Sequence, residues 1–145
     1  MKEAIHHIRK AIVNRLTNAI TVNGSYVPVY NKVPYDSSEP FIKVYSVSST
    51  EEFPNSTSYI SECITNIEVV TVFDYDGGGE LQSNQIANEI LQLLRTRSDQ
   101  YYDLSSDGFK VLTCELIKTT YTEENAEDRT YYRAILQMSN KILET

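Results

Sequence analysis

The feature that most constrains the fold is a long run of alternating side chains, from Tyr59 to Phe73, that ends at a glycine-rich turn. Successive side chains of a β-strand point to opposite faces, so this alternation predicts a single long strand. We expect one of its faces to lie in the core and the other to be partly exposed. The two faces are Cys63, Thr65, Ile67, Val69, Thr71 and Phe73, and Ile64, Asn66, Glu68, Val70 and Val72.

Two helices are predicted on either side of this strand. Apolar residues recur at intervals of three and four from Ala4 to Ile20, which predicts an amphipathic helix of about five turns. Asn23-Gly24 would end that helix or turn the chain just beyond it. A second helix begins at Leu81, directly after the glycine turn, and is expected to end near Arg97, with Ile86, Ala87 and Ile90 on its buried face.

The remaining patterns predict strands and polar loops. We expect an edge strand or extended connection at Val27–Tyr30, and a strand at Phe41–Ser49 followed by a polar loop at Glu51–Ser58. The last predicted elements are a strand at Phe109–Tyr121, an acidic loop at Thr122–Arg129 and a strand at Thr130–Ile142, which together form a hairpin.

This element order groups the strands instead of alternating them with helices. It predicts an α+β fold in which an antiparallel or mixed sheet of four to five strands carries two helices packed on one face. A length of 145 residues suits one core, and no linker or repeat is visible, so residues 1–145 are expected to form a single domain.

The glycine turn Asp74–Glu80 occupies the place where a nucleotide enzyme keeps its phosphate loop. Carboxylates surround its glycines, and no Lys or Arg accompanies them, so the turn would repel phosphate. As a calcium loop it fails at position twelve, which is Gln85, and as a dinucleotide fingerprint it fails at Gln82. Divalent metal binding by Asp74, Asp76 and Glu80 remains a weaker alternative.

Other chemistry is sparse, and we expect neither an enzyme nor a bound cofactor. His6 and His7, the only histidines, point about 100° apart if helical, and no nucleophile motif accompanies them. Cys63 and Cys114 are expected to be buried reduced thiols, with a disulfide between them as the alternative.

Charge and composition point to protein partners. A net charge of −7 without a basic cluster disfavours specific nucleic-acid binding, and 11 Tyr favour a sheet-rich protein that meets other proteins. There is no secretory leader pattern and no run apolar enough to span a bilayer, so we expect folding in the cytoplasm.

The chain resembles the small tail-terminator or tail-completion proteins of long-tailed bacteriophages. The resemblance rests on element order and apolar spacing along most of the chain, with Pro34, Pro40, Phe41, Val44 and the Ile86/Ala87/Ile90 helix face as its marks. It implies a virion protein that forms a ring, usually hexameric, at the head-proximal end of the tail tube. Such a ring stops tube growth and contacts the tail tube protein and the head connector or stopper, while DNA passes through it without specific binding.

The sheet edges and the loops are the expected ring and partner contacts, and the acidic hairpin end could meet a basic partner. The candidate residues are Tyr35, Asp36, Glu51, Glu52, Phe53, Asp74, Tyr75, Asp76, Glu123, Glu124, Glu127, Asp128 and Arg129. Another neck component, a head-completion or adaptor protein, is the nearest alternative function.

Overall fold

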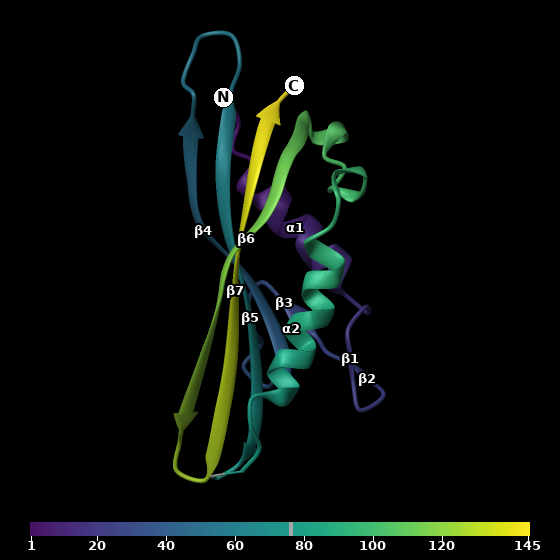
Figure 1. Ribbon diagram of the computed structural model, residues 1–145, viewed down its shortest axis with the longest axis vertical. Helices are drawn as coiled ribbons and strands as arrows, with labels where there is room; N and C mark the ends of the chain where they lie inside the picture. Colours follow the sequence, from purple (N-terminus) through teal and green to yellow (C-terminus); the bar gives the residue numbers. More distant parts are fainter. Residues whose placement is uncertain (76) are drawn as a thin grey trace.

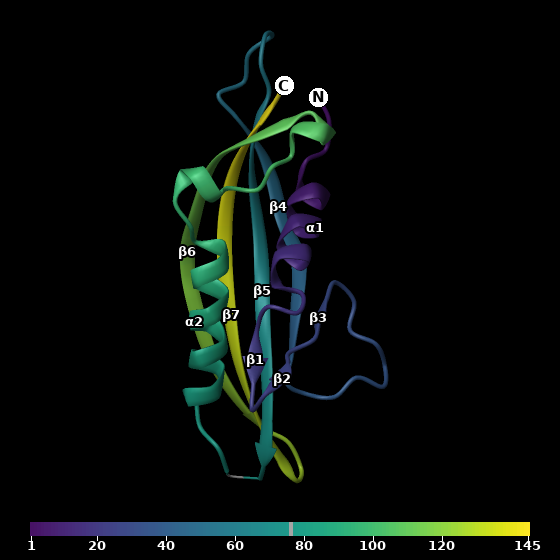
Figure 2. The same cartoon turned by 90° about the vertical axis from the view of Figure 1, so that its right-hand side faces the viewer.

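The computed structural model describes residues 1–75 and 77–145 and has an α+β fold. Five strands form one mixed sheet in the order β3-β4-β5-β7-β6, and two helices lie on one face of it (Figures 1 and 2). Within these described residues, the other face of the sheet carries no helix (Figure 1). The predicted fold class is therefore confirmed, including the placement of both helices on one face.

The chain order follows the expected series and adds a small hairpin and two short 3-10 helices. The elements are α1 (Ile5–Leu16), β1 (Thr21–Val22), β2 (Ser25–Tyr26), β3 (Val29–Tyr30), β4 (Phe41–Glu52), β5 (Ile60–Asp74), α2 (Leu81–Leu94), the 3-10 helices η1 (Ser98–Gln100) and η2 (Ser105–Asp107), β6 (Phe109–Asn125) and β7 (Arg129–Glu144). The added hairpin is β1–β2, whose turn residues Asn23 and Gly24 have φ values of 51° and 81°. Positive φ at both positions suits the Asn-Gly pair.

The central strand β5 follows its predicted pattern. Cys63, Thr65, Ile67, Val69 and Thr71 are buried beneath the helices, whereas Ile64, Asn66 and Glu68 on the opposite face are half-buried. Helix α1 packs Ile8, Ile12 and Leu16 into this core, and α2 adds Ile86, Ile90 and Leu94. Apolar burial under two helices is the main stabilising term of such a layer.

Before β6, three predicted boundaries were wrong. Helix α1 ends at Leu16, well short of the expected five turns, because Thr17 is extended and Asn18 adopts φ 56°. Ile20 still reaches the core, but from the turn that follows the helix. Helix α2 ends at Leu94, slightly before the expected Arg97.

The third error concerns Glu51 and Glu52, which were expected in a loop. Both residues extend β4, because they pair with Ser61 and Ile60 of β5. The alternation predicted for Phe41–Ser49 also breaks, at a bulge between Ser46 and Ser48. Backbone pairing with a long neighbour therefore outweighs the poor strand propensity of glutamate.

Candidate assembly surfaces

The glycine turn is shaped by contact with an aromatic ring. Gly78 has φ 76°, and a Cβ placed on it would lie 2.2 Å from the ring of Phe73. Phe73 itself packs edge-on against Tyr132, with ring centroids 5.8 Å apart. Both the backbone angle and the close approach require glycine at this position. The packing of the turn thus accounts for Gly78 without a ligand.

The carboxylates of this turn do not form a described metal site. Asp74 ends β5 opposite Arg129 of β7, and Glu80 stands at the N-cap position of α2 without a side-chain capping hydrogen bond. Both are exposed, whereas Asp76 lies outside the described residues. Among residues 1–75 and 77–145, no group of three or more His, Cys, Asp or Glu side chains is placed to hold a metal ion.

The acidic hairpin end is shorter than predicted. Glu123 and Glu124 belong to β6 and Arg129 to β7, so only residues 126–128 connect the strands, instead of a loop from Thr122 to Arg129. The cause is continuous pairing, which runs as far as Asn125 opposite Thr130. Glu127 and Asp128 remain exposed in the connection.

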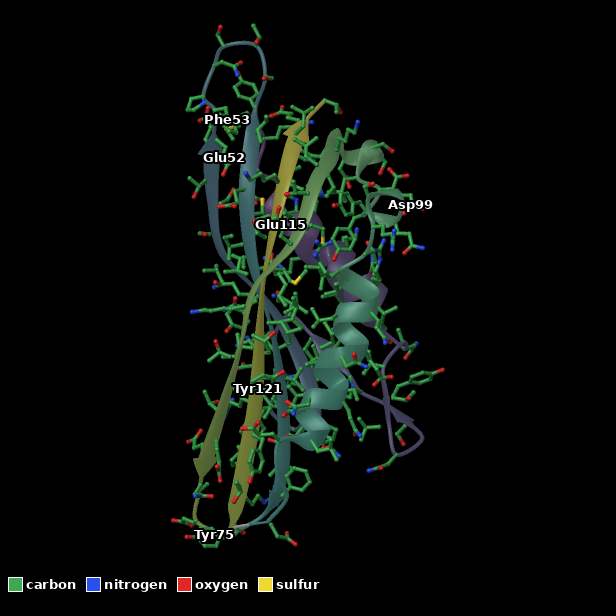
Figure 3. The ribbon with its side chains drawn as sticks, viewed as in Figure 1. Glu52, Phe53, Tyr75, Asp99, Glu115 and Tyr121 are labelled. Atoms are coloured by element: carbon green, nitrogen blue, oxygen red, sulfur yellow. The ribbon has the colours of Figure 1, made fainter. Side chains whose placement is uncertain are left out.

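The glycine turn and the hairpin end lie together. The backbone N–H of Tyr75 donates to the carbonyl of Asp128 over 2.9 Å, which joins the end of β5 to the β6–β7 connection. Asp74, Tyr75, Asp128 and Arg129 therefore share one end of the molecule, where Tyr75 is labelled in Figure 3.

Two further predicted contacts, Glu52 and Phe53, lie at the opposite end (Figure 3). The carboxylate of Glu52 is 3.0 Å from the Lys141 ammonium, and this hydrogen bond raises the pKa of Lys141. Phe53 has φ 47°, a left-handed conformation that is unfavourable for phenylalanine, and its side chain is 73% exposed. Glu51 is exposed beside it.

Tyr35 and Asp36 occupy a third place, the exposed loop between β3 and β4. The predicted contacts are consequently spread over two ends and one side of the protein. They do not converge on a single site, which suits contacts with several neighbours better than binding of one small ligand.

Ring assembly was expected through the sheet edges and loops, but sequence reasoning did not locate the segments of those edges that stay free. Strand β6 is the last strand, and its Lys118–Asn125 half is almost entirely exposed (Figure 3, near Tyr121). At the other edge, β3 pairs only with Ile42 and Lys43 of β4. From Tyr45 onward, no strand of the described chain covers the outer edge of β4. The signal was available in the sequence: Thr119–Thr122 and Tyr45–Thr50 contain no charged residue.

The helix-free face carries paired charges. The Arg133 guanidinium lies 3.8 Å from the Glu68 carboxylate and 3.5 Å from that of Glu124. Lys141 on the same face is paired with Glu52. Such cations are partly neutralised by neighbouring carboxylates and attract a polyanion less than isolated ones would.

A hollow of ≈ 450 Å³ lies between the β1–β2 hairpin, Pro40, Phe73 and Gln82. Among the described residues that line it, Glu39 and the phenol of Tyr26 are the ionisable groups. Gln82 and Phe73 also line a smaller, more apolar hollow beside Leu81. Neither hollow brings together an acid, a base and a nucleophile from the described residues.

Comparison with known proteins gives no identification. No protein-family model matches the chain, and no curated protein matches its sequence significantly. In residues 1–75 and 77–145, no helix is both long and apolar enough to cross a membrane.

Proposed function

We propose that this protein is a structural subunit that forms a closed ring with copies of itself, and that the ring is the terminator of a phage tail tube. The supporting observation is the direction of the two edge strands. Each neighbouring pair from β4 through β5 and β7 to β6 is antiparallel, so β4 and β6 run in opposite directions. Copies placed side by side in one orientation therefore set β6 of one antiparallel to β4 of the next.

Identical head-to-tail contacts of this kind close into a ring or continue as a filament, and a tube cap requires closure. Both helices lie on one face, so every copy would place its helix layer on the same side (Figure 2). A closed sheet has less room on its concave side, so we assign the helices to the outside and the helix-free face to the DNA passage. The paired charges around Arg133 would let DNA pass with little attraction.

The exposed aromatic residues supply contacts for other virion proteins. Phe53 projects at one end of the molecule and Tyr75 at the other (Figure 3). Aromatic side chains are enriched in the centres of protein interfaces. We propose that these two ends meet the tail tube protein and the head connector or stopper, and we assign the chain no catalytic role.

Electron microscopy of phage particles made with and without this gene tests the proposal. Without the protein, we expect tail tubes longer than normal that do not join heads. Tails of unchanged length that still join heads would contradict any role in the neck. Tails of normal length that fail to join heads would instead assign the chain to a head-completion or adaptor protein.

A further inference from the structure

The free halves of β4 and β6 have the geometry to pair with each other between two copies of the chain. We infer that Thr119–Glu123 of β6 forms an antiparallel ladder with Ser46–Glu51 of β4 in the next copy, with Tyr121 opposite Ser49 and with the bulge residues Ser46 and Val47 together opposite Glu123. This inference rests on the proposed ring and specifies its subunit contact. The partner is a second copy of this chain, and backbone direction, the space left by β3 and charge all favour it.

Alternate backbone groups of β6 face outward, away from β7. The N–H of Ala126 donates to the carbonyl of Arg129 over 2.8 Å, which makes this a hydrogen-bonded pair of the β6–β7 ladder. Hydrogen-bonded and non-hydrogen-bonded pairs alternate along an antiparallel ladder. Following the register back from Ala126, the peptide groups of Thr119, Tyr121 and Glu123 point away from β7 toward the free edge.

Alternate backbone groups of β4 also face outward, away from β5. The N–H of Ile42 donates outward to Pro28 over 2.9 Å, and the carbonyl of Val44 accepts from the Asn31 side chain over 2.9 Å. Continuing the alternation along β5 past the bulge, the peptide groups of Ser49 and Glu51 face the free edge. Among the described residues, no strand covers the outward groups of Ser49 and Glu51, so their hydrogen-bonding partner is water or another strand.

The two sets of outward residues belong to the same side of the sheet. Tyr121 lies opposite Ala134 in β7, and Ser49 lies opposite Cys63 in β5, both on the helix-covered face. Pairing Tyr121 with Ser49 therefore continues the pleat, with the helices of both copies on one side. A slip of one residue would place them on opposite sides.

Charge and space select this register among those that keep the pleat. With Tyr121 opposite Ser49, Lys118 lies opposite Glu52, and opposite charges in directly facing positions are favourable. Moving the β6 segment two residues toward the start of β4 would bring Glu124 to Lys43, where β3 already occupies the edge. Moving it two residues the other way takes Lys118 past the end of β4.

The charges also favour antiparallel over parallel pairing of β6 with β4 of the next copy. A parallel arrangement would bring Glu123 and Glu124 beside Glu51 and Glu52, so like charges would repel. The antiparallel register also displaces each neighbour along the strands, as the tilt of strands in a closed barrel requires. Both free segments lack the charged residues that usually protect exposed edges, at Thr119–Thr122 and Tyr45–Thr50.

Engineered disulfides test this register. Thr120 opposite Thr50, and Thr122 opposite Ser48, would form non-hydrogen-bonded pairs with Cα atoms about 4.5 Å apart, within the range that a disulfide spans. All four side chains are exposed, so substitution should leave the fold intact. The matched double variants are Thr120→Cys/Thr50→Cys and Thr122→Cys/Ser48→Cys, and the mismatched controls are Thr120→Cys/Ser48→Cys and Thr122→Cys/Thr50→Cys.

We expect mild oxidation of concentrated protein to give a ladder of covalent multimers for both matched variants, ending at the ring number on a non-reducing gel. The mismatched controls should give at least tenfold less product. Mixing the Thr120→Cys and Thr50→Cys single variants should give covalent dimers and nothing larger, because each copy then has one cysteine of the pair.

Two results would overturn the inference. Efficient dimers of Thr120→Cys alone would mean that two β6 edges pair symmetrically. The absence of a ladder in both matched variants would mean that this contact does not form. Electron micrographs of the same samples separate the ring hypothesis from the register hypothesis. Rings that form without cross-links would contradict the register and still support the proposed ring.

Discussion

Strands β6 and β7 form one hairpin, but β7 is buried in the middle of the sheet and β6 lies at its edge. Strand β7 lies between β5 and β6, and its inward residues from Thr130 to Ile142 are buried, with Leu136 at 0% exposure. Strand β6 is covered only along its first half, by η1, η2 and the end of α2. Two strands of similar composition thus divide into one that stabilises the fold and one whose free half is available to a partner.

The largest expected effect separates a central side chain from an edge side chain. Leu136→Ala should lower the free energy of unfolding by about 2–5 kcal/mol, because it removes buried apolar surface and leaves a cavity. Ile117, at a bulge of β6, is 50% exposed, so Ile117→Ala should cost less than about 1 kcal/mol. Urea denaturation measures both, and equal losses would mean that β6 is as deeply packed as β7.

A pair of proline substitutions tests the backbone orientation within β6. Thr120→Pro removes an N–H that faces β7 and should cost about 1–3 kcal/mol for the lost ladder bond. Tyr121→Pro removes an outward N–H, which an edge strand tolerates, and should destabilise the monomer less. Thermal unfolding measures the stability of the two variants. If Tyr121→Pro is the less stable one, the outward residues have been misassigned.

Thiol reactivity compares the covered and free halves of β6. The thiol of Cys114 lies 3.1 Å from the carbonyl of Leu94, and burial raises the pKa of both Cys114 and Cys63. At pH 8 these thiols should react with an aromatic disulfide reagent about 100-fold more slowly than the cysteine of a Thr120→Cys variant, because they need local opening.

The raised pKa of the Cys114 and Cys63 thiols also determines how the stability of the native state depends on pH. A thiol whose pKa is raised on folding stabilises the native state fully below the ordinary thiol pKa. This contribution declines as pH rises through the raised value, because the unfolded chain ionises first.

In the labelling experiment, fast reaction of native Cys114 would contradict the burial of the first half of β6.

The smallest expected effect concerns the ion pair between β6 and β7. Glu124→Gln removes one carboxylate from Arg133, which retains Glu68, so the loss should be at most about 1 kcal/mol and should vanish in high salt. Glu127→Gln in the exposed connection serves as the control. A larger loss, or one that persists in 1 M salt, would mean that this pair is more shielded from water than its exposure indicates.

Several features of the fold could be predicted because local patterns decide them. The alternation of β5 requires one buried face, and the spacing of Ile86, Ala87 and Ile90 requires a helix with one apolar side. Both predictions are confirmed. Cys63 and Cys114 are also buried free thiols as expected. Of the candidate contacts, most lie at exposed strand ends and loops, but their separation into distant groups was not visible in the sequence.

The sequence by itself determined which residues could form a core, because periodicity is a property of neighbouring positions. Tertiary structure decided where strands end and which edges stay free, because these depend on distant partners. Glu51, Glu123 and Glu124 are strand residues only since β5 and β7 extend beside them. Gly78 is required by Phe73 through a contact that no motif encodes. The outward peptide groups of β4 and β6 follow from strand order, which backbone hydrogen bonding across the whole sheet sets.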